Sequence, residues 1–338
     1  YGPTAVVDYL GCGYGGLKSR IQAIFFNRFG GATRPFGSLC WGAGTAAQRY
    51  DFGSYRAHWP DDVLNSDLIL VWGKNPKYTS LHLYSLLKQA EKRGSRVVVI
   101  DPVRTPTADS FGTHIPVRPA TDAALAFAMA KVIIDSGKED REFLSRHVIG
   151  FSRFKDSIQA FTPEYAEQIT GVPASDIRQL ALDYISSPAA SIHLGLGMQR
   201  YQNGGNTVRA IDALAAIAGR VGQKGGGVNY AAKSASPFLG SVENKSRAHI
   251  KEERLFSITR FADFLRRDPD PPVKASFIAG TNPLNQGPDI TGAVRQYSKI
   301  EFKVVFDLFM TDTARYSDIV LPAVSGFEQD DIFATSMY

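Results

Sequence analysis

Short, unbroken apolar runs recur along the chain, and each stops at glycine or aspartate. Residues 68–72 and 97–100 contain no polar position, and a stripe of Leu83, Leu87 and Ala90 lies between them at helical spacing. An apolar run of four or five residues between turn signals is typical of a strand buried on both faces. The alternation of such strands with helices predicts an α/β fold with parallel sheets, in which ligands bind at the strand ends.

The same pattern extends through most of the chain. Residues 4–10 and 190–194 are predicted strands, residues 17–29 and 206–219 are predicted helices, and helical sequence runs from Asp122 to about residue 184. Residues 231–273 are polar and have no clear period, so we predict a surface connection with one helical patch at 250–267.

Two segments far apart in the chain share a pattern of strand, loop, helix, strand and loop. Gly73-Lys74-Asn75-Pro76 follows one predicted strand, and Gly280-Thr281-Asn282-Pro283 follows another at 275–279. Asp101 and Asp307 then end the next strands, and both are followed at the same spacing by two threonines, an alanine and a proline: Thr105, Thr107, Ala108 and Pro116 in one copy, Thr311, Thr313, Ala314 and Pro322 in the other. This internal duplication predicts two pseudo-equivalent domains with Rossmann-like parallel sheets, one inserted into the other. We expect residues 1–55 with 235–338 to form one domain and residues 56–234 the other.

The duplicated loops have the chemistry of a nucleotide site. Glycine lets the backbone approach a ligand, asparagine offers a donor and an acceptor, and a helix N-terminus favours an anion. Asp101 and Asp307 are placed to accept ribose hydroxyls or guanine N–H groups, although a turn or cap role is the simpler alternative. Asp122 fits a ligand role and an N-cap role equally well.

Composition narrows the class of ligand and partner. The 338 residues have a net charge of +5 without a lysine or arginine block, which argues against nucleic acid and fits a small anionic cofactor. No apolar run approaches the roughly 18 residues that span a bilayer. Cys12 and Cys40 form no CxxC pair, so we expect no iron–sulfur cluster within these residues. The first residue is Tyr1, so we expect a longer protein and leave its compartment, cytoplasmic or periplasmic, open.

A nicotinamide dehydrogenase is one alternative. Gly11, Gly13 and Gly16 satisfy G-x-G-x-x-G after a predicted strand. The acidic residue expected about 20 positions later is missing, because residues 30–36 are Gly-Gly-Ala-Thr-Arg-Pro-Phe. The missing acid and the duplicated loops both count against this alternative.

The combined motifs resemble a known family. Gly73-Lys74-Asn75-Pro76, the segment Ile115-Pro116-Val117-Arg118-Pro119-Ala120-Thr121-Asp122, the segment at 307–323 and Gly195-Leu196-Gly197-Met198-Gln199 are similar to motifs of the dimethyl sulfoxide reductase type of molybdopterin oxidoreductases. The resemblance covers nearly the whole chain. It implies two molybdopterin guanine dinucleotides between two similar domains, with molybdenum or tungsten at the centre.

The resemblance also implies what lies beyond these residues. Family members carry an N-terminal iron–sulfur region and a C-terminal barrel-like domain, so we expect this chain to be a central portion that does not turn over alone. An iron–sulfur or cytochrome protein is the expected electron-transfer partner.

The resemblance implies a single protein ligand to the metal, and Cys40 occupies that position in Gly37-Ser38-Leu39-Cys40-Trp41. A soft thiolate suits such a metal, although a small buried cysteine is the simpler alternative. The candidate cofactor-binding residues are those at the motif positions: Gly73, Lys74, Asn75, Asp101, Pro102, Thr105, Pro119, Thr121, Asp122, Gly195, Gly197, Gln199, Gly280, Thr281, Asn282, Asp307, Thr311 and Thr313.

The expected activity is two-electron oxo or hydride transfer on a small molecule: formate, nitrate, or a sulfur or selenium oxyanion. A cysteine ligand argues against the serine-type sulfoxide and amine-oxide reductases and the aspartate-type nitrate reductases of the family. A non-catalytic electron-transfer scaffold of the same fold, without the metal cofactor, is the second alternative.

Overall fold

The chain forms two compact units. The computed structural model describes residues 1–338 apart from 12–15, 56, 232–235 and 333–338. Unit 1 comprises Tyr1–Cys40 and the described part of Ser234–Ser336, and unit 2 is the described part of Trp41–Lys233. Each unit holds an all-parallel sheet flanked by helices, so the predicted α/β class is confirmed.

The first boundary differs from the expected one at residue 55. It lies after Cys40, because α2 (Gly42–Phe52) packs along α11 (Gly204–Ile217) and therefore belongs to unit 2. The sequence around Cys40 is rich in glycine, which concealed this helix.

The sheet of unit 2 has the order β5-β4-β3-β6-β7. Its strands are β3 (Leu68–Trp72), β4 (Arg96–Ile100), β5 (His114–Ile115), β6 (Ala190–Leu194) and β7 (Val228–Asn229). Alternate residues of β3 enter different cores: Leu68, Leu70 and Trp72 face one, and Ile69 and Val71 face the other. All five side chains are fully buried, as the continuous apolar run predicted.

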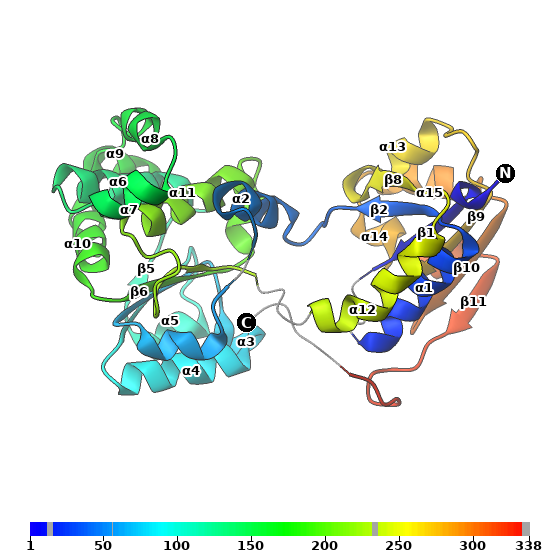
Figure 1. Ribbon diagram of the computed structural model, residues 1–338, viewed down its shortest axis with the longest axis horizontal. Coiled ribbons are helices and arrows are strands. Elements are labelled where there is room, and N and C mark those ends of the chain that lie inside the picture. The colour runs from blue at the N-terminus through cyan, green and yellow to red at the C-terminus, as the bar shows by residue number, and fades with distance from the viewer. Residues whose placement is uncertain (12–15, 56, 232–235, 333–338) are drawn as a thin grey trace. The chain divides into compact units, whose positions relative to one another are not determined.

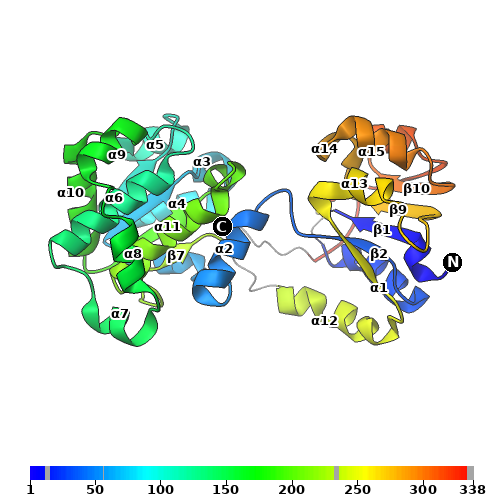
Figure 2. The same cartoon turned by 90° about the horizontal axis from the view of Figure 1, so that it is seen from above.

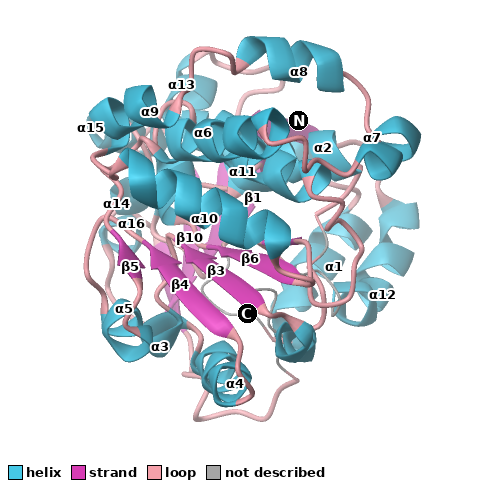
Figure 3. Ribbon diagram, turned by 90° about the vertical axis from the view of Figure 1, so that its left-hand side faces the viewer, coloured by secondary structure: helices cyan, strands magenta, loops and turns pink. Residues whose placement is uncertain are grey.

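Helices cover both faces of this sheet (Figures 1 and 3). On one side lie α3 (Pro76–Thr79), α4 (Leu81–Lys92) and α5 (Pro106–Phe111). On the other side lie α6 (Asp122–Asp135), α9 (Pro163–Thr170), α10 (Ala174–Ser186) and α11, with α7 (Arg141–His147) and α8 (Phe151–Ser157) beyond them. The short 3₁₀ helices of this unit are η3 (Pro60–Asn65) and η4 (Gly197–Arg200).

The sheet of unit 1 has the order β11-β10-β9-β1-β2-β8. Its strands are β1 (Val6–Leu10), β2 (Thr33–Phe36), β8 (Arg254–Ser257), β9 (Ala275–Ala279), β10 (Phe302–Asp307) and β11 (Ile319–Pro322). Figure 2 shows α13 (Phe261–Arg266), α14 (Pro283–Gln286) and α15 (Ile290–Tyr297) on one side of this sheet, and α1 (Arg20–Phe29) and α12 (Ser236–Ser246) on the other. The remaining short elements are η1 (Pro3–Ala5), η2 (Leu17–Ser19), η5 (Arg247–His249), η6 (Ile258–Arg260) and α16 (Asp312–Arg315).

The prediction of an irregular connection over residues 231–273 was wrong. In the described part of this segment, α12, β8 and α13 are integral to unit 1, and β8 pairs in parallel with β2 from Thr33↔Arg254 to Phe36↔Ser257. β8 is a short edge strand with a mixed polar pattern, so it lacks the period-two signal of a half-buried strand.

The two sheets have equivalent strand orders. β5-β4-β3-β6-β7 in unit 2 corresponds to β11-β10-β9-β1-β2 in unit 1, and β8 is added at the far edge. The chain order is permuted, because β1 and β2 precede the inserted unit and β9 to β11 follow it. The duplication seen in the sequence is therefore part of a longer equivalence that includes β1 and β6.

Each sheet has one topological switch point. The chain leaves β3 toward β4 and leaves the neighbouring β6 toward β7, on the opposite side. In unit 1 it leaves β9 toward β10 and β1 toward β2. Open α/β sheets bind ligands at the carboxyl ends of the strands that flank such a point. None of the described helices is both long and apolar enough to cross a membrane.

Candidate functional site

Two glycines meet at the switch point of unit 2. Gly73 follows β3 with a φ of +60°, which only glycine adopts without strain. Gly195 follows β6, and a Cβ on it would lie 1.6 Å from the Gly73 carbonyl oxygen and 2.9 Å from Lys74 Cα. The backbone N–H of Gly195 donates to the Trp72 carbonyl at 2.8 Å. The two strand-end loops are therefore in direct backbone contact, which brings both backbones close to any ligand bound there.

The switch point of unit 1 repeats this arrangement. Gly280 follows β9 with a φ of +63°, and a Cβ on Gly11, which follows β1, would lie 2.5 Å from the Gly280 carbonyl oxygen. The Gly11 N–H donates to the Ala279 carbonyl at 2.9 Å. We considered Gly11 only within the G-x-G-x-x-G pattern and missed this pairing, for which the alignment of Gly11 with Gly195 was the available signal. Residues 12–15 of the G-x-G-x-x-G pattern, including Cys12 and Gly13, lie outside the described residues.

The duplicated asparagines are tied to the duplicated threonines. Thr107 Oγ1 donates to Asn75 Oδ1 at 2.6 Å, and Thr313 Oγ1 donates to Asn282 Oδ1 at the same distance. The Thr313 backbone N–H also donates to Asn282 Oδ1, at 3.0 Å. These bonds fix the loop after β3 to α5 in unit 2 and the loop after β9 to α16 in unit 1. They also orient the two asparagine amides.

The other paired threonines are helix caps. Thr105 Oγ1 accepts from Ala108 N at 3.2 Å at the start of α5, and Thr311 Oγ1 accepts from Ala314 N at 3.3 Å at the start of α16. Each hydroxyl satisfies an N–H that the first helical turn leaves unpaired. These contacts explain why threonine occurs at both positions, and a role in cofactor binding stays a prediction.

The two strand-end aspartates each use one carboxylate oxygen in a local backbone hydrogen bond. Asp101 Oδ1 accepts from Val103 N at 2.9 Å, and Asp307 Oδ1 accepts from Leu308 N at 2.7 Å. Within the described residues, the Oδ2 atoms of both side chains form no hydrogen bond. Burial raises the pKa of Asp101 above its ordinary value.

Asp122 does not cap α6. It is the first residue of that helix, and Thr121 holds the N-cap position. Asp122 Oδ1 instead accepts from Trp72 Nε1 at 2.8 Å. Burial raises the pKa of Asp122, and the charge of Asp101 adds to this effect, so the two carboxyl groups interact.

Lys74 and Thr281 occupy equivalent positions with different chemistry. Burial lowers the pKa of Lys74 to about 8. Thr281 Oγ1 donates to Gln286 Oε1 at 2.9 Å. One switch point therefore carries an amine that titrates near neutral pH, and the other carries a hydroxyl.

The remaining candidates lie at or near these loops. Pro102 and Pro119 are exposed, and Thr121 Oγ1 donates to the Arg118 carbonyl at 2.7 Å. A Cβ on Gly197 would lie 4.0 Å from the Gly73 carbonyl oxygen, an ordinary contact.

Gln199 contacts the start of α2, and Cys40 precedes this helix by two residues in the chain. Gln199 is buried, and its Oε1 accepts from the Gly44 backbone N–H at 3.2 Å. Cys40 is half-buried in the segment that joins the two units, and its N–H donates to Ser38 Oγ at 3.0 Å. Among the described residues, no group of three or more histidine, cysteine, aspartate or glutamate side chains has the arrangement of a metal site.

The fold and the paired switch points are those of an open α/β protein with two similar halves, a class that binds ligands at the strand ends. The family model for molybdopterin oxidoreductase matches residues 17–338. The probable oxidoreductase YyaE of Bacillus subtilis is 39% identical over 99% of this chain and 50% of its own length. The F420-dependent formate dehydrogenase subunit alpha of Methanocaldococcus jannaschii is 29% identical over 88% of this chain and 46% of its own length.

A solved structure has the same fold. Acetylene hydratase from Pelobacter acetylenicus superposes with a TM-score of 0.75 at 24% identity and covers 95% of this chain and 49% of its own. The chain belongs to the molybdopterin oxidoreductase family, in its dimethyl sulfoxide reductase branch. It spans about half the length of the curated relatives it matches. Family membership implies a molybdopterin with molybdenum or tungsten.

Proposed function

We propose that the full-length protein is a molybdenum or tungsten oxidoreductase in which each unit binds one pterin guanine dinucleotide at its switch point and Cys40 is the protein ligand to the metal. The observation that carries the proposal is the glycine contact repeated in the two units, Gly73 with Gly195 and Gly280 with Gly11. Family membership supplies the identity of the cofactor.

The residues fit such a cofactor. The metal, once bound, supplies the two-electron chemistry. Asp101 Oδ2 and Asp307 Oδ2 would accept ribose hydroxyls or guanine N–H groups, and the glycine pairs would let the backbone approach the cofactor. Lys74, whose pKa is lowered to about 8, would hold or release a proton beside an anionic group of the cofactor. It would do so only at the switch point of unit 2, because unit 1 has Thr281 at the equivalent position. Cys40 supplies a soft thiolate.

Formate, nitrate, and sulfur or selenium oxyanions are the substrate classes we propose. One relative is named as a formate dehydrogenase, which is consistent with the first of them. An iron–sulfur or cytochrome protein is the proposed electron-transfer partner. The alternative, a scaffold without the metal, is disfavoured by the cysteine at position 40 and the intact loops at Asn75 and Asn282.

Metal and pterin analysis of the purified full-length protein tests the proposal. We expect about one molybdenum or tungsten atom and two guanine nucleotides per chain after acid extraction. A protein without either metal or pterin would favour the scaffold alternative.

A Cys40→Ala variant tests the ligand. We expect it to keep its pterin but to lose turnover with a viologen dye and formate or nitrate, because the thiolate is absent. Ser38→Thr is the control, since it changes the same segment but keeps the hydroxyl that accepts from the Cys40 N–H. Unchanged activity in Cys40→Ala would remove this residue from the mechanism.

A further inference from the structure

A pair of carboxyl groups lies between α2 and α11, away from the strand-end loops. Asp212 on α11 is 1% exposed, and Gln48 on α2, also 1% exposed, donates from Nε2 to Asp212 Oδ1 at 3.0 Å. Asp51, one turn further along α2, is close enough to Asp212 for its negative charge to raise the Asp212 pKa. Arg209 Nε donates to Asp51 Oδ1 at 2.8 Å.

The hydrogen bonds of this pair leave two carboxyl oxygens without a donor among the described residues. Asp212 Oδ2 and Asp51 Oδ2 are both buried, and neither accepts from any donor among the described residues. Two ionised carboxylates are acceptors only, so they cannot bond to each other. One proton held between them satisfies both oxygens and removes one of two like charges from a buried site.

The charges around the pair favour this state. Burial raises the pKa of Asp212 well above its ordinary value, and the charge of Asp51 adds to the increase. The hydrogen bond from Gln48 and the positive charge of Arg209 lower the Asp212 pKa and so oppose this increase. Helices α6 and α7 and the 3₁₀ helix η4 also pack on α11, and Asp51 and Arg209 are the charged groups with the largest effect on Asp212.

Helix α2 begins two residues after Cys40 and is fixed at both ends. At its start, the Gly44 N–H bonds to Gln199, and a Cβ on Gly44 would lie 2.4 Å from Tyr230 Oη, so this turn packs directly on the rest of unit 2. Trp41, the N-cap, packs against the main core of unit 2. The carboxyl pair provides the polar contact at the other end of the helix.

We propose that Asp212 is a positioning residue: it shares one proton with Asp51 and so fixes α2 on α11. Because α2 begins two residues after Cys40, this contact also fixes the segment that follows Cys40. Deprotonation puts two adjacent negative charges at a buried helix contact and loosens α2. The relevance to Cys40 rests on the proposed function, whereas the proton-sharing pair does not.

Hydrogen exchange of the full-length protein between pH 6 and pH 9.5 tests this proposal. After correction for the intrinsic rates, we expect exchange in residues 42–52 to accelerate at least tenfold with rising pH in the wild type. Asp212→Asn keeps an acceptor for Gln48 and a donor for Asp51 without a titrating proton, so its exchange in this segment should not depend on pH. Asp51→Asn should behave in the same way, and it keeps the test decisive if Asp212→Asn does not fold.

Asp135→Asn is the matched control, because Asp135 is a half-exposed carboxylate on α6 in the same unit, paired with Lys131. It should retain the wild-type pH dependence. A wild-type segment without pH dependence, or an Asp51→Asn variant that keeps it, would overturn the proposal. Exchange needs neither metal nor turnover, so a protein found to lack molybdenum and tungsten would refute the proposed function and leave this result standing.

Discussion

At the scale of single residues, the closest contact at a switch point is the one between Gly195 and the Gly73 carbonyl. No side chain fits at position 195, because even a methyl group would overlap backbone atoms of the neighbouring loop. The contact sets the distance between the two strand-end loops of unit 2.

Gly195→Ala should therefore separate these loops. We expect a loss of about 1–3 kcal/mol in the free energy of unfolding, as for an overpacked core, and a lower pterin content. Gly197→Ala is the matched control, since its Cβ meets the same carbonyl oxygen at 4.0 Å. Urea unfolding and pterin extraction measure both effects, and equal behaviour of the two variants would contradict the role of the contact.

The sequence identified these residues more readily than their contacts. It placed Gly73, Asn75, Asp101 and their partners at the ends of strands, because the duplication and the apolar runs are local patterns. It did not predict that the threonines bond within the loops, or that Gly11 and Gly195 contact the first loop of each unit. These contacts join residues 31 to 269 positions apart, so no local spacing encodes them.

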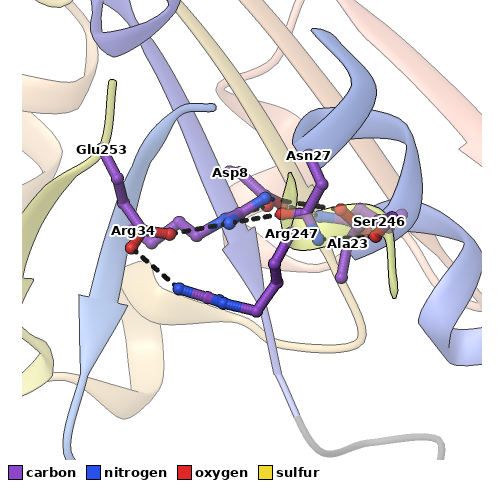
Figure 4. Close-up of polar contacts among 8 residues, drawn as sticks. Asp8, Ala23, Asn27, Arg34, Ser246, Arg247 and Glu253 are labelled. Carbon is purple, nitrogen blue, oxygen red and sulfur yellow. Dashed lines mark hydrogen bonds and ion pairs between the residues drawn. The ribbon is translucent and has the colours of Figure 1, made fainter. Parts of the chain in front are cut away.

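At the scale of elements, buried polar side chains join four pieces of unit 1. Arg34 on β2 donates from Nε to Asp8 Oδ2 on β1 at 2.7 Å, and from Nη1 to Asn27 on α1 and to Glu253, each at 2.8 Å (Figure 4). Gln22 donates to the other Asp8 oxygen at 2.6 Å. Asp8 and Arg34 are 3% and 13% exposed, so their charges are largely removed from water.

Arg34→Met should leave Asp8 buried without its ion-pair partner. We expect a loss of about 3–5 kcal/mol, the range for breaking a buried pair. Arg266→Met is the control: it removes exposed contacts to Asp263 and Asp289, which water and salt screen, so it should cost far less than Arg34→Met. Urea denaturation compares the two, and similar losses would contradict a buried pair.

The pH dependence of this loss has a definite sign. Burial raises the pKa of Asp8 and Arg34 opposes that shift, so removing Arg34 raises the pKa further. A raised carboxyl pKa means that the native state binds more protons than the unfolded state, and stability falls as the pH rises toward that pKa. The difference between the wild type and Arg34→Met should therefore widen as the pH increases from 4.

The elements that were predicted correctly are those whose burial is visible in the sequence. β3, β4, β9 and β10 are apolar runs or lie between strong turn signals. β7 and β8 were missed because β7 has two residues and β8 is a polar edge strand. β2 was also missed, because it contains Pro35 and proline is uncommon inside strands.

At the scale of the molecule, the two units use the same tie between an asparagine and a threonine, with one difference. Asn75 Oδ1 accepts only from Thr107 Oγ1 within the described residues, whereas Asn282 Oδ1 also accepts from the Thr313 backbone. Replacing the threonine by valine should therefore have unequal effects in the two units.

Thr107→Val should cost about 1–3 kcal/mol, the range for an acceptor left without its donor, and Thr313→Val about 0.5–1.5 kcal/mol. Thr107→Ser and Thr313→Ser keep the hydroxyl and serve as controls. Hydrogen exchange measured separately in α3 and α14 gives the local effect in each unit. A larger loss in Thr313→Val than in Thr107→Val would contradict the difference in hydrogen bonding.

The permuted strand order has a consequence for synthesis on the ribosome. β1 pairs with β9 from Val6↔Ala275 onward, and unit 2 lies between these strands in the chain. β1 and β2 therefore leave the ribosome long before the strand that completes their sheet, while unit 2 has all its strands within one continuous segment. Domains generally fold as units during translation, so unit 2 should fold before β9 is synthesised. Until then the edge of β1 is unpaired, and it is open to chaperones and to aggregation.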